Sequence, residues 1–346
     1  MFRHTGVSNA NGSASAVTIA IPGLRAPLRC MHLSDSHVDL GPDEESGSLE
    51  LCHAMFTCCE LSTEPSATRG CFYPTLTIVA YLCIADNTGP TIDGPDRQQI
   101  ERRGFQQLPL EALSDQLALA TEERVDLLLH TGDLINFPSP RAAHHAHGLL
   151  TADDRRMLFI SGNHDWQHVP PLPGTPDEVR EGGRARALGP FFPPSRDPSN
   201  WAEDVGGIRF IGIDNSSMRV TDEQSRFFEQ AVAGVTAAVL MVHVPLFLPS
   251  LLAVGMKDGI TPLKRRDLFA VPPTETQGGA DDATLRFAAA VAQCPSLACV
   301  LAGHIHDATA HPLTEDNSGP VQYTVDAGCY GGCRILDFMP ATTCRL

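Results

Sequence analysis

The chain has 346 residues, of which 42% are hydrophobic and 19% are charged, as expected for a globular protein with one large domain. Its formal net charge of −16 argues against a nucleic-acid partner, because phosphate contacts need clustered Lys and Arg side chains. The longest apolar run, residues 72–85, is too short to span a bilayer and contains Pro74, so we expect no membrane insertion.

The N-terminal region is predicted to divide into a tail and the start of the domain. Residues 1–15 are small and polar, which favours a disordered tail, and residues 16–346 are predicted to form the domain. Residues 16–21 are rich in β-formers and favour an edge strand. The 11 cysteines include no Cys-x-x-Cys pair, and without a signal peptide we expect reduced thiols and a cytoplasmic location. The lack of Asp and Glu in residues 1–34 only faintly resembles a transit peptide.

Residues 49–105 are predicted to be an atypical insertion in the domain. They hold several cysteines and show no clean helical or strand period, and so long a structureless stretch is unusual inside a compact domain. Three explanations stay open: a cap over a site, a partner-binding insertion, or a non-native translated segment. A cysteine metal cluster is less favoured, because the spacings are irregular.

Five short apolar runs are each followed by polar side chains that can bind metal. We predict a β-strand for each run, namely residues 28–33, 125–130, 157–161, 237–242 and 297–302. Ligand sites in open α/β sheets lie outside the carboxyl ends of the strands. The side chains that follow the five runs are therefore predicted to share one site: Asp35, His37, Asp133, Asn163, His243, His304 and His306.

The chemistry of these seven side chains indicates two metal ions. Mixed imidazole and carboxylate ligands suit Mn, Fe or Zn, whereas Mg and Ca prefer oxygen. Seven side chains are too many for one ion but fit two if one carboxylate bridges, and the central Asp133 is the natural bridge. Such a pair can hold both the attacking and the leaving oxygen of a phosphoryl transfer. We expect Asp35 with His37, and His304 with His306, to face the site from extended segments.

The elements between the motifs are predicted from periodicity and turn chemistry. Leucines at helical spacing predict a helix over residues 108–123. A short helix after Pro140 holds three histidines, for which we favour a solvated face over a metal tract: His144, His145 and His147. We interpret His130 as a hydrogen-bonded core residue. Residues 167–204 are rich in Pro and Gly and predict a long rim loop.

The second half of the chain continues with a strand over residues 207–213. For residues 214–217 we favour a turn and helix cap over a loop near a second metal ion. Thr221 is predicted to cap a helix that runs to residue 233. Residues 281–292 predict another helix, and residues 321–326 and 334–338 are expected to pair with each other.

A second long loop is predicted over residues 247–280. It holds the most basic patch of the acidic chain: Lys257, Lys264, Arg265 and Arg266. Two interpretations stay open, a solvated face and recognition of a substrate phosphate by arginine.

The five motifs, in this order, resemble the calcineurin-like metallophosphoesterase superfamily over residues 28–338. The residues that carry the resemblance are Asp35-x-His37, Gly132-Asp133, Gly162-Asn163-His164-Asp165, His243 and Gly303-His304-x-His306. It implies an α/β fold of two packed mixed β-sheets flanked by helices, and a hydrolase with two metal ions. The implied ligands of one ion are Asp35, His37, Asp133 and His306. Those of the other are Asp133, Asn163, His243 and His304. His164 would bind no metal but act beside the leaving oxygen as proton donor or stabiliser.

Two departures from the motifs of known branches narrow the subgroup of the superfamily that the sequence resembles. Asn136 replaces the acid that orients the histidine in the Ser/Thr phosphatases, and no tyrosine lies near Asn136 as in purple acid phosphatases. His164 would then be held by a backbone carbonyl or by Asp165. The first-choice substrate is a small phosphodiester such as a cyclic nucleotide, attacked by a metal-bound hydroxide. The alternatives are a phosphomonoesterase, a non-catalytic binding protein of the same fold and, disfavoured by the negative charge, a nuclease.

Overall fold

The structure is a computed structural model that describes residues 2–8, 14–38, 109–136, 138–166, 176–194, 196–248, 251 and 282–341. The insertion predicted at residues 49–105 lies wholly outside these ranges, and most of the loop predicted at residues 247–280 does too.

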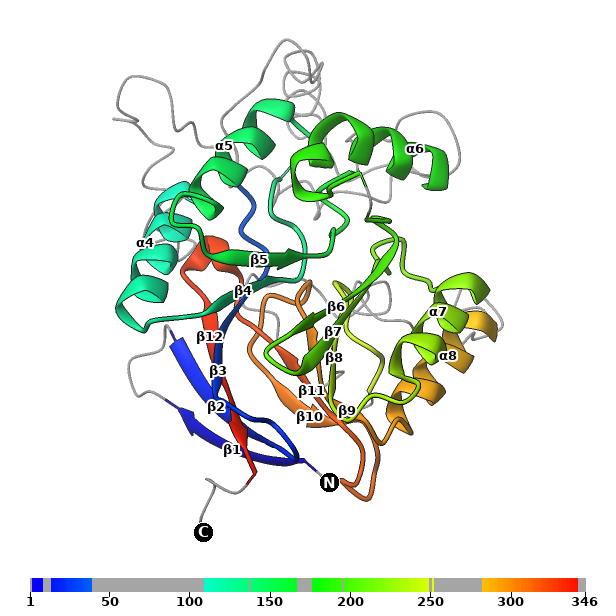
Figure 1. Cartoon of the computed structure of the whole chain (residues 1–346). Coiled ribbons are helices and arrows are strands. Elements are labelled where there is room, and N and C mark those ends of the chain that lie inside the picture. Colours follow the sequence, from blue (N-terminus) through cyan, green and yellow to red (C-terminus); the bar gives the residue numbers. More distant parts are fainter. Residues whose placement is uncertain are drawn as a thin grey trace, which may run out of the picture.

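Two six-stranded mixed β-sheets form the centre of the molecule (Figure 1). The first sheet has the order β1 (Arg3–Ser8), β2 (Ala14–Ile21), β12 (Cys333–Pro340), β3 (Leu28–Leu33), β4 (Leu127–His130) and β5 (Arg156–Phe159). The second has the order β10 (Ala310–Pro312), β11 (Val321–Thr324), β9 (Leu297–Ala302), β8 (Ala238–Met241), β7 (Ile208–Ile213) and β6 (Asn200–Val205). The predicted fold class, two mixed sheets flanked by helices, is confirmed.

Side chains alternate between the two faces of each sheet, which produces three apolar layers. Cys30 of β3 and Leu301 of β9 lie in the core between the sheets. Met31 and Leu33 of β3 point the other way, into the layer under α4 (Pro109–Glu122) and α5 (Pro140–Leu150). On the second sheet the outer layer packs under α7 (Asp222–Val232) and α8 (Asp282–Ala292). The helices therefore cover the outer faces, as Figure 1 shows.

The predicted helices are present close to their expected limits. Helix α7 begins as expected with a capping box, in which Thr221 Oγ1 accepts from the Gln224 N–H and the Gln224 side chain accepts from the Thr221 N–H. Among the described helices, none has the length and apolarity to cross a membrane.

The parallel strands of both sheets bring their carboxyl ends to one edge. In the first sheet β3, β4 and β5 are parallel, and in the second β7, β8 and β9 are parallel. Hydrogen bonds join the loops that follow them across the two sheets. The His304 N–H donates to Asp35 Oδ2 over 2.9 Å, and His243 Nδ1 donates to the Thr131 carbonyl over 2.9 Å. The candidate site lies at this junction.

Three predictions about strands differ from the structure. Residues 3–8, expected in a disordered tail, form β1, because their backbone pairs with β2, which is thus not an edge strand. The strands expected to pair with each other belong to different sheets: β11 pairs with β9, while β12 lies between β2 and β3. Strand pairing across parallel sheets is remote in sequence, so local pattern does not reveal it.

The region 167–204, predicted as a rim loop, contains regular elements in its described part. These are helix α6 (Pro176–Gly183), a π-helical turn (Arg184–Leu188), a 3₁₀ turn (Gly189–Phe191) and strand β6. Gly183 packs against the backbone of Trp166, where a Cβ atom would lie 2.8 Å from Trp166 Cα. Gly183 is therefore needed for close packing against Trp166 and not for a loop conformation. A glycine of this kind makes the composition of the region resemble that of a loop.

Candidate metal centre

The ligand candidates lie on sharp turns rather than on extended segments. Asp35, His37, Asp133, His304 and His306 all have positive φ values, between 45° and 68°. The expectation of an extended backbone for the pairs Asp35–His37 and His304–His306 is therefore wrong. Both members of each pair nevertheless reach the site. Non-glycine residues adopt this conformation at a cost that the surrounding structure must offset, and such residues cluster at functional sites.

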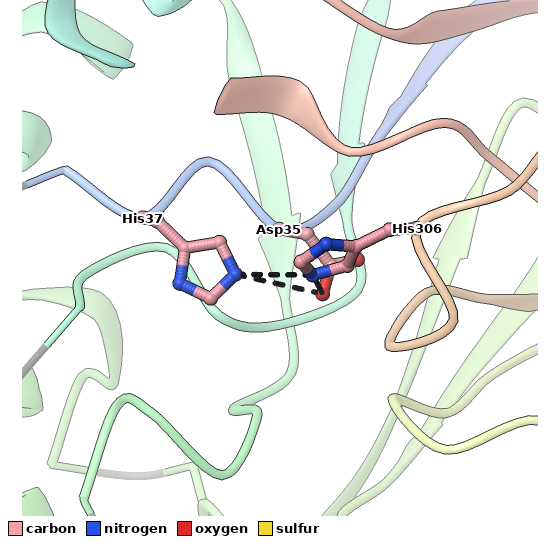
Figure 2. A group of neighbouring side chains, drawn as sticks. All are labelled: Asp35, His37 and His306. Carbon is pink, nitrogen blue, oxygen red and sulfur yellow. Dashed lines mark hydrogen bonds and ion pairs between the residues drawn. The ribbon is translucent and has the colours of Figure 1, made fainter. Parts of the chain in front are cut away.

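The first group consists of Asp35, His37 and His306. Their donor atoms lie within 4.8 Å of one another, and all three side chains are buried. His306 Nε2 lies 3.3 Å from Asp35 Oδ1 and 3.3 Å from His37 Nε2. Figure 2 shows the two imidazoles turned toward the Asp35 carboxylate, from loops that are far apart in the sequence. Ligands around one ion with bonds of about 2.1 Å approach one another to similar distances.

The second group consists of Asp133, His243 and His304, with Asn163 beside them. His243 Nε2 is the common point: it lies 3.4 Å from Asp133 Oδ2, 3.1 Å from Asn163 Oδ1 and 3.1 Å from His304 Nδ1. Since His243 Nδ1 donates to the Thr131 carbonyl, Nε2 is the nitrogen directed at the group. The structure thus brings all seven predicted ligands into one site, as two groups.

Asp133 connects the two groups. Its Oδ2 lies 3.9 Å from His37 Nε2 of the first group and 3.4 Å from His243 Nε2 of the second. Asp165 braces the Asp133 turn, because its carboxylate accepts the backbone N–H groups of Asp133, Ile135 and Gly162 over 2.7–3.0 Å. Asp165 therefore acts on the backbone of this turn.

The charges of the groups fit the binding of cations. Burial opposes ionisation of Asp35 and Asp133, but the neighbouring histidines outweigh it, so both pKa values lie below their usual range. Burial, reinforced by other histidines, lowers the pKa of His37 and His304 to about 3, which leaves these imidazoles neutral and able to bind metal. Burial would lower the pKa of His243, but the Asp133 carboxylate raises it to about 9.

The effect of Asp133 on the pKa of His243 indicates that this carboxylate favours positive charge in the buried site. Asp35 Oδ1 is buried as well, and within the described part of the chain its near neighbour is His306 Nε2 at 3.3 Å, with no hydrogen bond donated to it. A divalent cation in each group would satisfy both carboxylates, and the carboxylate and imidazole donors suit Mn, Fe or Zn. The residues present therefore fit a pair of metal ions.

Two glycines let the ligand turns approach one another. A Cβ atom on Gly162 would collide with the Asp133 carboxylate, and one on Gly303 would collide with the side chains of Ser34 and Asp35. Both positions therefore require the absence of a side chain, which explains why a glycine precedes Asn163 and His304.

His164 lies beside the first group. Its ring is perpendicular to that of His37, with 4.6 Å between the centroids, and its backbone N–H donates to Asp133 Oδ1 over 2.8 Å. Its Nδ1 lies 3.1 Å from the backbone carbonyl of Asn136 and donates to it. Of the two expected partners, the carbonyl therefore orients His164. The side chain is half-buried, so Nε2 is the nitrogen available to a ligand.

The other histidines named from the sequence lie outside the groups. His130 is fully buried, with Nε2 3.0 Å from Ser36 Oγ and Nδ1 accepting the Gly132 N–H, which confirms a hydrogen-bonded core residue. On α5, His144 and His145 are exposed and His147 packs edge-on against Phe191, so the preferred solvated face agrees with the structure.

Sequence reasoning missed Asn215 as a residue of the site. Its side chain is buried and binds the backbone of His243 and Val244. The stretch 214–217 was predicted to be a turn and cap, with a loop near the second ion as the weaker alternative. Its Asn is an ordinary turn residue in sequence, and only the three-dimensional contact with a remote turn distinguishes it.

With this geometry described, comparison with known proteins defines the class. The family model for calcineurin-like phosphoesterases matches residues 28–308, which is most of the chain. The chain therefore belongs to this family. No curated protein matches the chain in sequence.

Two solved structures resemble the fold. One is a purple acid phosphatase from yellow lupin (Lupinus luteus) seeds, with 16% identity and a TM-score of 0.48, covering 92% of this chain and 47% of that one. The chain thus spans about half the length of the lupin structure. The other is a dimetal phosphatase from Danio rerio, with 13% identity and a TM-score of 0.42, covering 88% of this chain and 89% of that one.

Proposed function

We propose that the protein hydrolyses a small phosphodiester, of the size of a cyclic nucleotide, at a pair of metal ions. Asp35, His37, Asp133 and His306 would hold the first ion, and Asp133, Asn163, His243 and His304 the second. The observation that carries the proposal is the position of Asp133, whose carboxylate faces His37 of one group and His243 of the other.

The two ions, of Mn, Fe or Zn, would add positive charge at the substrate phosphate and lower the pKa of a nearby water. His164 would act from the chain itself. The Asn136 carbonyl holds its Nδ1–H and thereby fixes the ring, so that Nε2 can give a proton to the leaving oxygen or stabilise its charge. The carbonyl thus orients His164 through a hydrogen bond to an uncharged backbone group.

The side chains of the site favour a phosphodiester substrate over a phosphomonoester substrate. Among the residues that the structure describes, the side chains that converge here are imidazoles, carboxylates and one amide, and the ion pairs of Asp35 and Asp133 are with histidines rather than with Lys or Arg. A phosphomonoester dianion carries more charge than a diester and would gain more from a guanidinium contact. A phosphomonoesterase is the second candidate. A non-catalytic binding protein is disfavoured, because all seven donors converge and His164 is oriented beside them.

The test is hydrolysis by metal-stripped protein refilled with Mn²⁺. We expect a higher kcat/KM for bis(p-nitrophenyl) phosphate than for p-nitrophenyl phosphate. A higher kcat/KM for the monoester would show that the protein is a phosphomonoesterase and not a phosphodiesterase. No turnover of either compound by protein that binds two ions would contradict catalysis.

The role of His164 has its own test. We expect His164→Ala to lower kcat by about 10²-fold or more while the protein still binds two Mn²⁺ ions, because His164 acts on the leaving oxygen and holds no ion. His145→Ala, which changes an exposed histidine on α5, is the matched control and should leave kcat unchanged. An unchanged kcat in His164→Ala would remove His164 from the mechanism.

A further inference from the structure

The loop that follows β7, residues 214–217, contributes none of the proposed ligands but contacts two of the turns that carry ligands of the second ion, those of Asn163 and His243. We propose that this loop positions His243 and Asn163, and thereby sets the affinity of the second metal position without contacting either ion. The inference deepens the proposed function and rests on it. It assigns Asn215 as the principal positioning residue.

Asn215 forms hydrogen bonds to the backbone of the turn that carries His243. Its Oδ1 accepts the backbone N–H groups of His243 over 3.1 Å and Val244 over 2.9 Å, and its Nδ2 donates to the Val244 carbonyl over 2.7 Å. The side chain is 2% exposed, so water cannot replace these bonds at low cost. All three bonds fix the backbone that directs His243 Nε2 at Asp133, Asn163 and His304.

The residues on either side of Asn215 hold the turn of Asn163. Asp214 Oδ2 accepts from Ser161 Oγ over 2.7 Å, and Ser216 Oγ accepts from Trp166 Nε1 over 2.8 Å. Ser161 and Trp166 flank the Gly162–Asp165 turn, on which Asn163 lies. Residues 214–217 are therefore hydrogen-bonded to both ends of the Gly162–Asp165 turn.

The loop is itself rigidly held. Asp214 is fully buried and forms an ion pair with Arg184 of the π-helical turn, a residue that is 4% exposed. The Ser216 N–H donates to Asp214 Oδ1 over 2.8 Å, and Gln224 of α7 donates to the Asp214 carbonyl over 2.7 Å. A buried, fully bonded carboxylate of this kind fixes one loop conformation.

The turn of Asp35, in the first metal position, is held by different residues. The N–H groups of Gly328 and Cys329 donate to the carbonyls of Ser34 and Asp35 over 2.8 and 3.0 Å. Gln116 of α4 holds this segment through its Nε2, which donates to the carbonyls of Gly328 over 3.1 Å and Gly332 over 2.7 Å. Loss of the Asn215 bonds should therefore weaken one position and spare the other.

The experiment measures Mn²⁺ affinity in two backgrounds that each keep one position. His306→Ala keeps the second position and His304→Ala keeps the first. We expect Asn215→Leu to weaken Mn²⁺ binding about ten- to hundredfold in the His306→Ala background, as loss of an outer hydrogen-bond partner does at other metal sites. In the His304→Ala background the affinity should not change. Equal weakening in both backgrounds, or none in either, would overturn the inference.

Two further variants separate positioning from loss of fold. Asn215→Asp keeps the oxygen that accepts both N–H groups and should retain more second-position affinity than Asn215→Leu. Gln116→Leu removes another buried amide, with two hydrogen bonds, and should leave second-position affinity unchanged even where the unfolding temperature falls. If Gln116→Leu weakens the second position as much as Asn215→Leu does, general destabilisation explains the loss and the inference is wrong.

The same measurements distinguish this inference from the proposed function. A wild-type protein that binds two Mn²⁺ ions and hydrolyses the diester, with no position-specific loss in Asn215→Leu, would refute only the positioning role. A wild-type protein that binds fewer than two ions would refute the metal pair itself.

Discussion

At the scale of single residues, the candidate ligands lie on turns with strained backbone conformations, and hydrogen bonds connect these turns to one another. Five of the seven proposed ligands have positive φ, a conformation that costs about 1–2 kcal/mol for each L-residue. Backbone hydrogen bonds between the turns offset this cost: the Asp35 N–H donates to the Gly132 carbonyl and the His37 N–H to the Asp133 carbonyl, each over 2.9 Å. Hydrogen bonds within the protein therefore hold the backbone of the ligand turns.

Gly303→Ala tests this interlocking. A Cβ atom there would displace Ser34 and Asp35, so we expect Mn²⁺ affinity at the first position to fall at least tenfold. Overpacking of this kind should also lower the free energy of unfolding by about 1–3 kcal/mol. The matched control is Gly148→Ala on α5, where a Cβ would meet nothing within 4 Å and stability should rise by up to about 1 kcal/mol. Wild-type affinity in Gly303→Ala would show that the turns are not tightly packed.

His32 predicts a dependence of stability on pH. Burial, with the nearby charge of Arg334, lowers the pKa of His32 to about 3, while the unfolded chain takes up this proton below about pH 6.5. The unfolded state therefore binds more protons in this window, and stability falls as the pH drops from 6.5 toward 3. The contribution of His32 is about 2 kcal/mol between pH 6.5 and pH 5.

We expect His32→Gln to flatten this dependence, measured as the free energy of unfolding by urea at both pH values. The exposed His145 provides the control, because His145→Gln should leave the slope unchanged. An unchanged slope in His32→Gln would mean that His32 titrates normally in the folded protein.

At the scale of elements, the sequence was most informative where a strand ends in a ligand. The apolar runs that precede Asp35, His243 and His304 form β3, β8 and β9, because buried strands need continuous apolar residues. The sequence was least informative about pairing. The position of β12 between β2 and β3, and the contact of Asn215 with the His243 turn, depend on residues remote in sequence, which no local period encodes. Strand β1 pairs with its chain neighbour β2 and was missed because its residues are small and polar.

Capping also belongs to this scale. The Thr221 side chain accepts the Gln224 N–H at the start of α7, so we expect Thr221→Ala to lower the free energy of unfolding by about 1 kcal/mol. Thr221→Ser keeps the hydroxyl and should restore most of this loss, and kcat should be unchanged in both. Equal stability of the Ala and Ser variants, by urea unfolding, would show that the cap contributes nothing.

At the scale of the whole molecule, the proposed metal centre lies between the two sheets and takes ligands from both. Asp35, Asp133 and Asn163 follow strands of the first sheet, whereas His243 and His304 follow strands of the second. An ion that binds ligands from both sheets binds only the folded protein, so it stabilises the fold by mass action.

Removal of the metal should therefore lower the unfolding temperature. At free Mn²⁺ concentrations of 100 to 1,000 times Kd, the expected loss on chelation is about 3–4 kcal/mol for each site. The variant His304→Ala, which lacks a ligand of the second position, should show a smaller shift with EDTA than the wild type. The same unfolding temperature with and without EDTA would place the ions, if bound, outside the junction of the sheets.

The most direct test of the central claim is a Mn²⁺ titration of the metal-free protein, followed by electron paramagnetic resonance. A carboxylate shared by two ions predicts two Mn²⁺ per chain and a spectrum of two magnetically coupled ions. In Asp133→Ala the coupled spectrum should disappear, since this residue is the proposed bridge. One ion per chain, or two ions that show no coupling in the wild type, would contradict a metal pair built around Asp133.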